Sequence, residues 1–202
     1  MNRLEVKNLA CERGGRLLFS NLSFSLNPGA VLVIEGRNGA GKTTLLRMLA
    51  GLRSIEDGVV SFDGLSIEQL ADAYYQQMAY LGHLNAVKYD LTVSENLKFA
   101  QQLSTVVSNI DDALHKVGLD GYQDTLSRHL SAGQKRKLAL ARLLCIHKRL
   151  WILDEPFTSL DKSSIAMFEG LIHEHVSQGG MVIITTHHPI NLPDSILLRL
   201  TL

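Results

Sequence analysis

The fold of this chain is decided by residues 30–44, which read AVLVIEGRNGAGKTT. The apolar run that ends in Glu35 predicts a strand covered on both faces, as in a parallel sheet. Next, residues 36–43 match the pattern GxxxxGK[ST], and the apolar residues that follow Lys42 recur at helical spacing. A buried strand, a glycine-rich loop and a helix therefore follow one another without a gap, which predicts a phosphate-binding loop.

Each residue type in this loop has a physical task. Glycines let the backbone curl so that several N–H groups face one anion, and the helix N-terminus adds partial positive charge. Lys42 brings a point charge to the β- and γ-phosphates, and the Thr43 hydroxyl is placed to ligate Mg²⁺. We assign the nucleotide contacts to Gly36, Arg37, Asn38, Gly39, Ala40, Gly41, Lys42, Thr43 and Thr44. Kinases, GTPases and motor ATPases share this loop, but the guanine-specific NKxD pattern is absent from the sequence, which disfavours a GTPase.

The composition allows one compact domain or a core with an inserted lobe, because 202 residues that are 46% hydrophobic can bury a large core. The 20 basic residues balance 20 acidic ones, so no overall field draws the chain toward nucleic acid or an anionic bilayer. Cys11 and Cys145 form no CxxC pair, which fits a reducing compartment better than a disulfide framework. Apolar runs are strand length and the N-terminus is charged, so we expect a cytosolic protein without membrane insertion.

The remaining pattern predicts an α/β fold in which strands alternate with helices. We expect, in chain order, two half-buried strands within residues 3–26, a short strand at 59–62, a strand at 150–153, a helix near 162–178, and strands at 181–186 and 196–200. Strands separated by helices indicate a parallel sheet with helices on both faces. Residues from about 66 to 145 read as helix-rich, with Thr92 and Glu95 forming a capping box. We therefore expect an inserted helical lobe there, and a core from about 1–65 and 145–202.

Residues 150–156, LWILDEP, form an apolar strand that ends in two carboxylates. This places Asp154 and Glu155 at the carboxyl edge of the sheet, where the phosphate loop also lies. Asp154 can hold Mg²⁺ through water, and Glu155 can orient or deprotonate an attacking water. The alternative interpretation is a pair of acids that caps the turn before Pro156.

Residues 130–134, LSAGQ, open another helical pattern, and a basic run follows at 135–137. A serine and a glycine at a helix N-terminus make a second anion pocket, whereas the basic run alone is typical of a solvated helix face. With this motif the chain resembles an ATP-binding-cassette (ABC) ATPase, a family whose signature reads LSGGQ. Ala132 stands where the family pattern has glycine.

The resemblance implies a P-loop NTPase (RecA-like) core, an N-terminal antiparallel β subdomain, an inserted helical subdomain, and hydrolysis of ATP with Mg²⁺. It also implies a head-to-tail homodimer, because in this family the two anion pockets of one chain do not face each other. Ser131, Gly133 and Gln134 of one protomer then close over the γ-phosphate held by the other. Residues 159–161, SLD, resemble the family's D-loop and add Asp161 to the nucleotide site.

Two histidines are assigned by the same resemblance. His187 follows a Thr-Thr pair and matches the switch histidine that contacts the γ-phosphate; its neighbour His188 is the alternative. His83 falls where the family has a glutamine that senses Mg²⁺ and the attacking water, counting back from residues 91–93, LTV. Gln76, Gln77 or a merely solvated histidine are the alternatives to His83.

The family's adenine-stacking aromatic residue is missing, because no aromatic residue lies between Ala10 and Leu18. Arg13 or Arg16 is the expected substitute, through stacking of its guanidinium group on the base. We expect loose base selectivity as a consequence.

Several segments narrow the resemblance to the ATPase subunits of bacterial cytochrome c maturation (haem exporter) systems. They are residues 8–13, 18–26, Glu35, 80–83 and 150–161. This implies a motor on the cytoplasmic face of the inner membrane, bound to integral membrane permease subunits, which drives release of a haem-loaded chaperone. The segment from 83 to 89 is the expected contact with a membrane subunit. Alternatives are the ATPase of another small ABC transporter, a soluble ABC ATPase in translation or repair, and a P-loop kinase.

Overall fold

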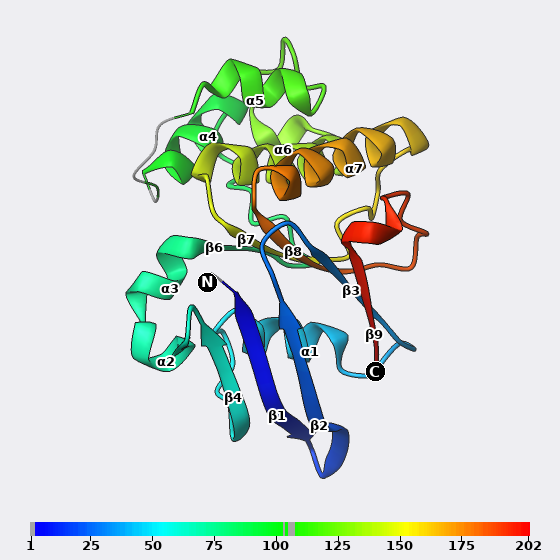
Figure 1. The fold of residues 1–202 in the computed structure, drawn as a ribbon. Helices are drawn as coiled ribbons and strands as arrows, with labels where there is room; N and C mark the ends of the chain where they lie inside the picture. Colours follow the sequence, from blue (N-terminus) through cyan, green and yellow to red (C-terminus); the bar gives the residue numbers. More distant parts are fainter. Residues whose placement is uncertain (1–2, 103, 105–107) are drawn as a thin grey trace.

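The computed structural model describes residues 3–102, 104 and 108–202. It contains two sheets, a four-stranded sheet in the order β2-β1-β4-β5 and a five-stranded sheet in the order β6-β7-β8-β3-β9. Figure 1 shows the first sheet at one end of the molecule, the second in the middle, and a group of helices at the other end. The α/β architecture expected from the sequence is confirmed.

The smaller sheet is antiparallel throughout. Its strands are β1 (Leu4–Arg13), β2 (Arg16–Leu26), β4 (Asp57–Phe62) and β5 (Leu65–Ser66). Gly14 and Gly15 join β1 to β2, both with positive φ, as a tight two-residue hairpin turn requires. The hairpin brings the ends of β1 and β2 together, so that Arg13 pairs with Arg16.

The larger sheet is parallel between every pair of neighbouring strands. Its strands are β3 (Val31–Glu35), β6 (Met78–Leu81), β7 (Leu150–Asp154), β8 (Met181–Thr185) and β9 (Leu197–Thr201). The short strand β6 was not expected, because it lies inside the interval that reads as helix-rich. A strand of four residues is too short for a period to stand out from its helical surroundings.

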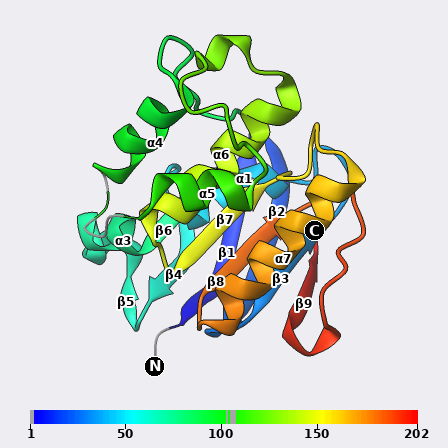
Figure 2. The ribbon, with the colours of Figure 1, turned by 90° about the horizontal axis from the view of Figure 1, so that it is seen from above.

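The helices lie on both faces of the parallel sheet. They are α1 (Lys42–Leu49), α2 (Ile67–Leu70), α3 (Asp72–Gln77), α4 (Val93–Gln101), α5 (Ile110–Lys116), α6 (Ala132–Ile146) and α7 (Lys162–Ser177), with short 3₁₀ helices η1 (Ser127–His129) and η2 (Asp194–Ile196). Figure 2 shows α5, α6 and α7 above this sheet. The capping box predicted for Thr92 and Glu95 is present at the start of α4.

Two apolar cores follow from the alternation of side chains along the strands. On β3, Val31 and Val33 pack with α4 to α7 on one face. Leu32 and Ile34 pack with α1 and the antiparallel sheet on the other. The parallel sheet therefore separates the helical end of the molecule from the antiparallel end. In the described part of the chain, no helix combines the length and apolar character needed to cross a bilayer.

Strand register places the functional segments at one edge. Ile34 pairs with Thr185 and Asp154 also pairs with Thr185, so β3, β7 and β8 end at the same level. The phosphate loop, the two carboxylates and the histidines after β8 all follow these strand ends. Because the strands are parallel, the three segments meet at the carboxyl edge of the sheet.

Candidate active site

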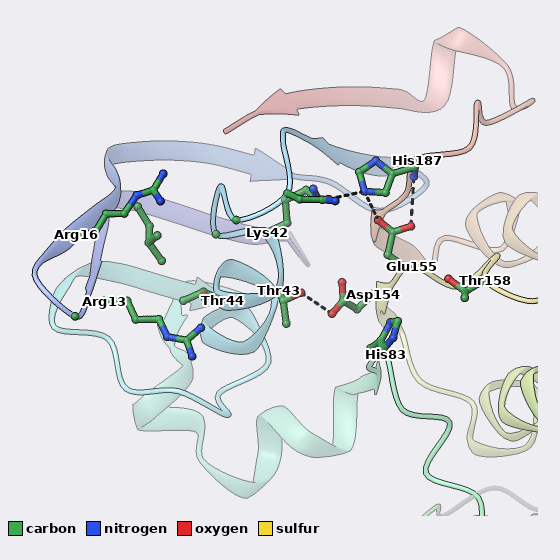
Figure 3. A pocket seen from close by; sticks show the side chains of 15 residues that line it. Arg13, Arg16, Lys42, Thr43, Thr44, His83, Asp154, Glu155, Thr158 and His187 are labelled. Atoms are coloured by element: carbon green, nitrogen blue, oxygen red, sulfur yellow. Dashed lines mark hydrogen bonds and ion pairs between the residues drawn. The ribbon is translucent and has the colours of Figure 1, made fainter.

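One cavity of about 740 Å³ lies at this edge, within the size range of small-molecule sites. Figure 3 shows side chains from the β1–β2 hairpin, the phosphate loop, and the ends of β6, β7 and β8 around it. The lining residues are Arg13, Gly14, Arg16, Leu18, Asn38, Gly39, Gly41, Lys42, Thr43, Thr44, His83, Asp154, Glu155, Thr158 and His187. Segments far apart in the sequence therefore form one site.

The phosphate loop presents the unblocked N-terminus of α1 to the cavity. Gly41 precedes the helix with φ +104°, a conformation that favours glycine, and no side chain caps the helix at this position. The first N–H groups of α1 are therefore free to bind an anion. Lys42 Nζ donates to the carbonyl oxygens of Gly36 (2.7 Å) and Arg37 (3.3 Å), which holds its charge beside the loop. Gly36, Arg37 and Ala40 shape the loop and do not line the cavity.

Asp154 ends β7 as a buried carboxylate, 3% exposed. Thr43 Oγ1 donates to Asp154 Oδ2 at 2.9 Å, and Thr185 Oγ1 donates to Oδ1 at 2.8 Å. A hydroxyl and a carboxylate are hard oxygen ligands, so Thr43 and Asp154 fit Mg²⁺. Among the residues that the structure describes, no group of three or more His, Cys, Asp or Glu could hold a metal. A Mg²⁺ ion at this position would need its other ligands from phosphate oxygens and water, which is usual for Mg²⁺.

Glu155 lies in a left-handed backbone conformation, with φ +48°. Its N–H donates to the carbonyl oxygen and to Oγ1 of Thr185, both at 3.1 Å. Its Oε2 accepts from the backbone N–H of His187 at 3.3 Å. Its buried Oε1 accepts no hydrogen bond from the described residues and lies 3.4 Å from His187 Nε2. One carboxylate oxygen thus lacks a hydrogen-bond donor among the described residues.

His187 joins the carboxylate to the phosphate loop. Its Nε2 lies 3.1 Å from Asn38 Oδ1, in addition to the contact with Glu155 (Figure 3). Because an amide oxygen and a carboxylate are both acceptors, this geometry assigns the ring proton to Nε2. The alternative residue His188 does not line the cavity and packs its ring against Phe157, with centroids 6.3 Å apart.

His83 lines the cavity next to Asp154 and is exposed (Figure 3). The alternatives Gln76 and Gln77 lie in α3 and are absent from the cavity lining. Arg13 and Arg16 line the far end of the cavity, on the hairpin side, away from Glu155 (Figure 3). The two arginines therefore lie at the hairpin end of the cavity, and His83 lies at the end that holds Asp154 and Glu155.

Besides Gly36, Arg37 and Ala40 of the phosphate loop, four predicted site residues lie outside the cavity lining: Ser131, Gly133, Gln134 and Asp161. Ser131 and Gln134 form a capping box at the start of α6. Asp161 caps α7 by accepting from Ser164 N at 2.8 Å and from Ser163 Oγ at 2.9 Å. These hydrogen bonds lower the pKa of Asp161 to about 2, so the carboxylate is charged at neutral pH.

Sequence reasoning missed several residues of this region, including Thr158, Thr185 and Arg136. Thr158 lines the cavity, and Thr185 donates to Asp154. Arg136 lies in the basic run that alone resembles a solvated helix face, yet it is 2% exposed. One signal could have found it, because Arg136, Leu140 and Leu143 follow the i, i+4, i+7 spacing of a buried helix face.

Comparisons with known proteins bear on the fold and the family. The family model for the ABC transporter matches residues 19–158. A solved structure described as an ATP-binding subunit of an ABC transporter is 25% identical, with a TM-score of 0.83 over 91% of this chain and 79% of that chain. A putative ABC transporter ATP-binding protein from Pyrococcus furiosus, also 25% identical, gives 0.84 over 98% and 96%. The fold and the site define an ABC-type ATPase.

Relatives of higher sequence identity indicate the family within this class. The cytochrome c biogenesis ATP-binding export protein CcmA of Dechloromonas aromatica is 48% identical over 94% of this chain and 95% of its own length. The protein of the same name from Escherichia coli is 45% identical over 100% of this chain and 97% of its own length. This chain belongs to the CcmA family of ABC transporter ATPases.

Proposed function

We propose that this chain is the ATP-hydrolysing motor of a haem exporter complex for cytochrome c maturation, and that ATP turnover drives release of a haem-loaded chaperone. The main support for an ATPase site is that one cavity is lined by Thr43, Asp154, Glu155 and His187. The names of the CcmA relatives support the role in cytochrome c biogenesis.

The hydrolytic roles follow from the positions of these side chains. Lys42 and the N-terminus of α1 bind the phosphates and stabilise negative charge that builds up on them. Glu155 orients the attacking water through Oε1, which has no other hydrogen-bond donor among the described residues, and accepts its proton, while the new bond forms to the γ-phosphorus and the bond to the β–γ bridging oxygen breaks. His187 donates from Nε2 toward the γ-phosphate, and His83 contacts the water beside Asp154. Mg²⁺, held by Thr43 and through water by Asp154, neutralises phosphate charge when bound.

The assembly that we propose is a head-to-tail homodimer on the cytoplasmic face of the inner membrane. Ser131, Gly133 and Gln134 lie outside their own chain's cavity, which supports their action on the nucleotide of a partner protomer. Integral membrane permease subunits are the further partners, and the exposed segment from 83 to 89 is their proposed contact. Leu84 in this segment is 82% exposed, as expected of a residue that a partner covers.

Glu155→Gln tests the assignment of the base. We expect the variant to bind ATP with normal affinity, because Lys42 and α1 are unchanged, and to lose at least about 100-fold in hydrolysis. Calorimetry and phosphate release measure the two quantities. The trapped ATP state should also accumulate as a dimer in sedimentation. Turnover at the wild-type rate would remove Glu155 from the role of base.

Purification of the tagged full chain in mild detergent tests the proposed complex. We expect integral membrane proteins of cytochrome c maturation to be recovered with it and identified by mass spectrometry. Recovery of permeases of another transport system, or of ribosomes or DNA, would contradict the haem exporter assignment and leave the ATPase site unaffected.

A further inference from the structure

We propose that Arg136 is a positioning residue that fixes Glu155 relative to the loop bearing His83. The inference rests on the proposed role of Glu155 as the base. Arg136 lies in the first half of α6, between the end of β7 and the loop that follows β6. Arg136 does not line the cavity. Of the residues that do, it binds only Asp154 and Glu155, and it binds them through their backbone carbonyl oxygens.

On one side, the guanidinium group binds the end of β7. Its Nε donates to the carbonyl oxygen of Pro156 at 2.9 Å. Its Nη2 donates to the carbonyl oxygens of Asp154 at 3.1 Å and Glu155 at 2.7 Å. Three consecutive carbonyl groups of the acidic turn therefore converge on one side chain.

On the other side, Nη1 binds the loop after β6. It donates to the carbonyl oxygen of Gly82 at 3.2 Å and to Asn85 Oδ1 at 2.9 Å. These two acceptors flank His83 in the sequence. A guanidinium group has five N–H donors in one plane, and Arg136 has five acceptors spread over the two segments. A lysine ammonium group, with three donors at one point, cannot reach the same set.

The burial of Arg136 indicates that these bonds are needed. It is 2% exposed, and all five of its acceptors are carbonyl or amide oxygens, none a carboxylate. Burial lowers its pKa to about 10, while the nearby charges of Asp154 and Glu155 act in the opposite direction. A buried charge is costly unless its hydrogen bonds are satisfied, so the site retains Arg136 at a cost in solvation.

The backbone of Glu155 shows what the bonds hold in place. Its φ of +48° is unfavourable for a residue with a side chain, and such residues persist only where their surroundings fix them. Arg136 binds its carbonyl oxygen, and Thr185 binds its N–H group. Both peptide units that flank the Cα atom of Glu155 are thus fixed, and this aims the carboxylate into the cavity. A small shift of this group is expected to slow the chemical step strongly.

Arg142 provides a matched control on the same helix. Its Nη1 donates to the carbonyl oxygens of Asn85 (3.2 Å) and Ala86 (2.7 Å), and burial lowers its pKa as well. Arg142 therefore binds the loop as Arg136 does. Within the described residues, its side chain makes no hydrogen bond to the end of β7. A merely structural role for arginines of α6 that bind this loop would affect both residues alike.

The test compares Arg136→Gln, Arg136→Lys and Arg142→Gln in the full chain, purified with its membrane-associated complex. We expect both Arg136 variants to lose about 10- to 100-fold in kcat. Their KM and calorimetric Kd for ATP should stay within about threefold of wild type, because the phosphate loop is unchanged. Arg142→Gln should keep kcat within about threefold. Thermal unfolding is measured in parallel.

Several outcomes overturn the inference. One is a normal kcat in both Arg136 variants; another is a loss of ATP affinity in step with kcat; a third is an equal loss in Arg142→Gln. If Arg136→Gln fails to fold, Arg136→Lys decides together with Asn85→Ala, which removes one of the two loop acceptors. Normal kcat in both variants contradicts the proposal. Glu155→Gln is assayed beside the Arg136 variants. Normal turnover of Glu155→Gln would reject Glu155 as the base. If Glu155→Gln is inactive while the Arg136 variants are active, only the role of Arg136 is rejected.

Discussion

Asp154 and Glu155 are neighbours in the sequence, but their side chains have different surroundings. Both oxygens of Asp154 accept from threonine hydroxyls, which allows a charged group to be buried at the end of β7. Glu155 Oε1, by contrast, is buried and accepts no hydrogen bond from the described residues. The first carboxylate is therefore suited to a fixed role near a cation, and the second to an exchange of protons with water.

His175 shows how a single residue sets a pH dependence of stability away from the site. Its ring stacks on Trp151, with centroids 3.9 Å apart and planes 5° apart. Burial lowers its pKa from 6.5 to about 4. Between these values the unfolded chain binds a proton that the folded chain does not, so protonation favours unfolding. The stability contributed by neutral His175 is complete above about pH 6.5 and is lost as the pH falls toward 4.

His175→Phe isolates this effect, because phenylalanine keeps the stacking and cannot ionise. We expect the wild type to lose at most about 3 kcal/mol more unfolding free energy than the variant between pH 7 and pH 4. Urea unfolding at a series of pH values measures the difference. Parallel pH curves for the two proteins would contradict the lowered pKa.

At the scale of elements, helix α6 contacts several of the segments that form the site. Its N-terminus carries the capping box of Ser131 and Gln134. One turn later Arg136 binds the ends of β6 and β7. Gly133 lies between them and faces the loop before α7: a Cβ atom at this position would lie 2.8 Å from the carbonyl oxygen of Ser159. The helix and this loop therefore pack in direct backbone contact.

Gly133→Ala tests this contact. We expect a loss of about 1–3 kcal/mol in unfolding free energy, because the added methyl group forces the helix and the Ser159 backbone apart. Gly170→Ala in α7 is the control, since nothing lies within 4 Å of its added Cβ atom. The control should gain up to about 1 kcal/mol from helix propensity. Equal effects in thermal unfolding would show that the close contact does not matter.

At the scale of the whole molecule, the parallel sheet divides the chain into an antiparallel end and a helical end. The antiparallel end and the strand ends enclose the cavity, while Ser131 and Asp161 lie outside its lining. The second anion pocket that we propose at the N-terminus of α6 therefore does not meet the cavity of its own chain. The proposed head-to-tail dimer brings the surface of one chain to the cavity of its partner.

Ser131→Arg tests this assembly. We expect the bulky side chain to block the ATP-dependent dimer, while each monomer binds ATP normally because its own cavity is untouched. Loss of the cap costs about 1 kcal/mol of stability, which thermal unfolding detects. Sedimentation in the Glu155→Gln background measures the dimer, with Gln178→Arg at the opposite end of α7 from Asp161 as control. A normal ATP-bound dimer in the Ser131 variant would reject the head-to-tail arrangement.

Much of the fold could be predicted because its signals are local. The apolar runs, the phosphate loop at residues 36–43 and the cap at Thr92 each lie within a few residues, and the corresponding elements are present. Strand β6 escaped prediction because four residues carry too little pattern. For the candidate site, the sequence assigned His187 with His188 as the alternative, and the structure places His187 in the cavity lining.

The sequence by itself determined the chemistry that short motifs carry: a phosphate loop, two carboxylates at a strand end, and a family resemblance that relatives along nearly the whole chain support. Only the tertiary structure decided how these parts meet. Thr43 reaches Asp154 across 111 positions, and His187 reaches Asn38 across 149. Arg136 is buried for the same reason, since its acceptors lie 18 to 54 positions away. Local sequence patterns determine the secondary structure and the chemical groups of each segment. Strand register and burial determine which other residues those groups contact.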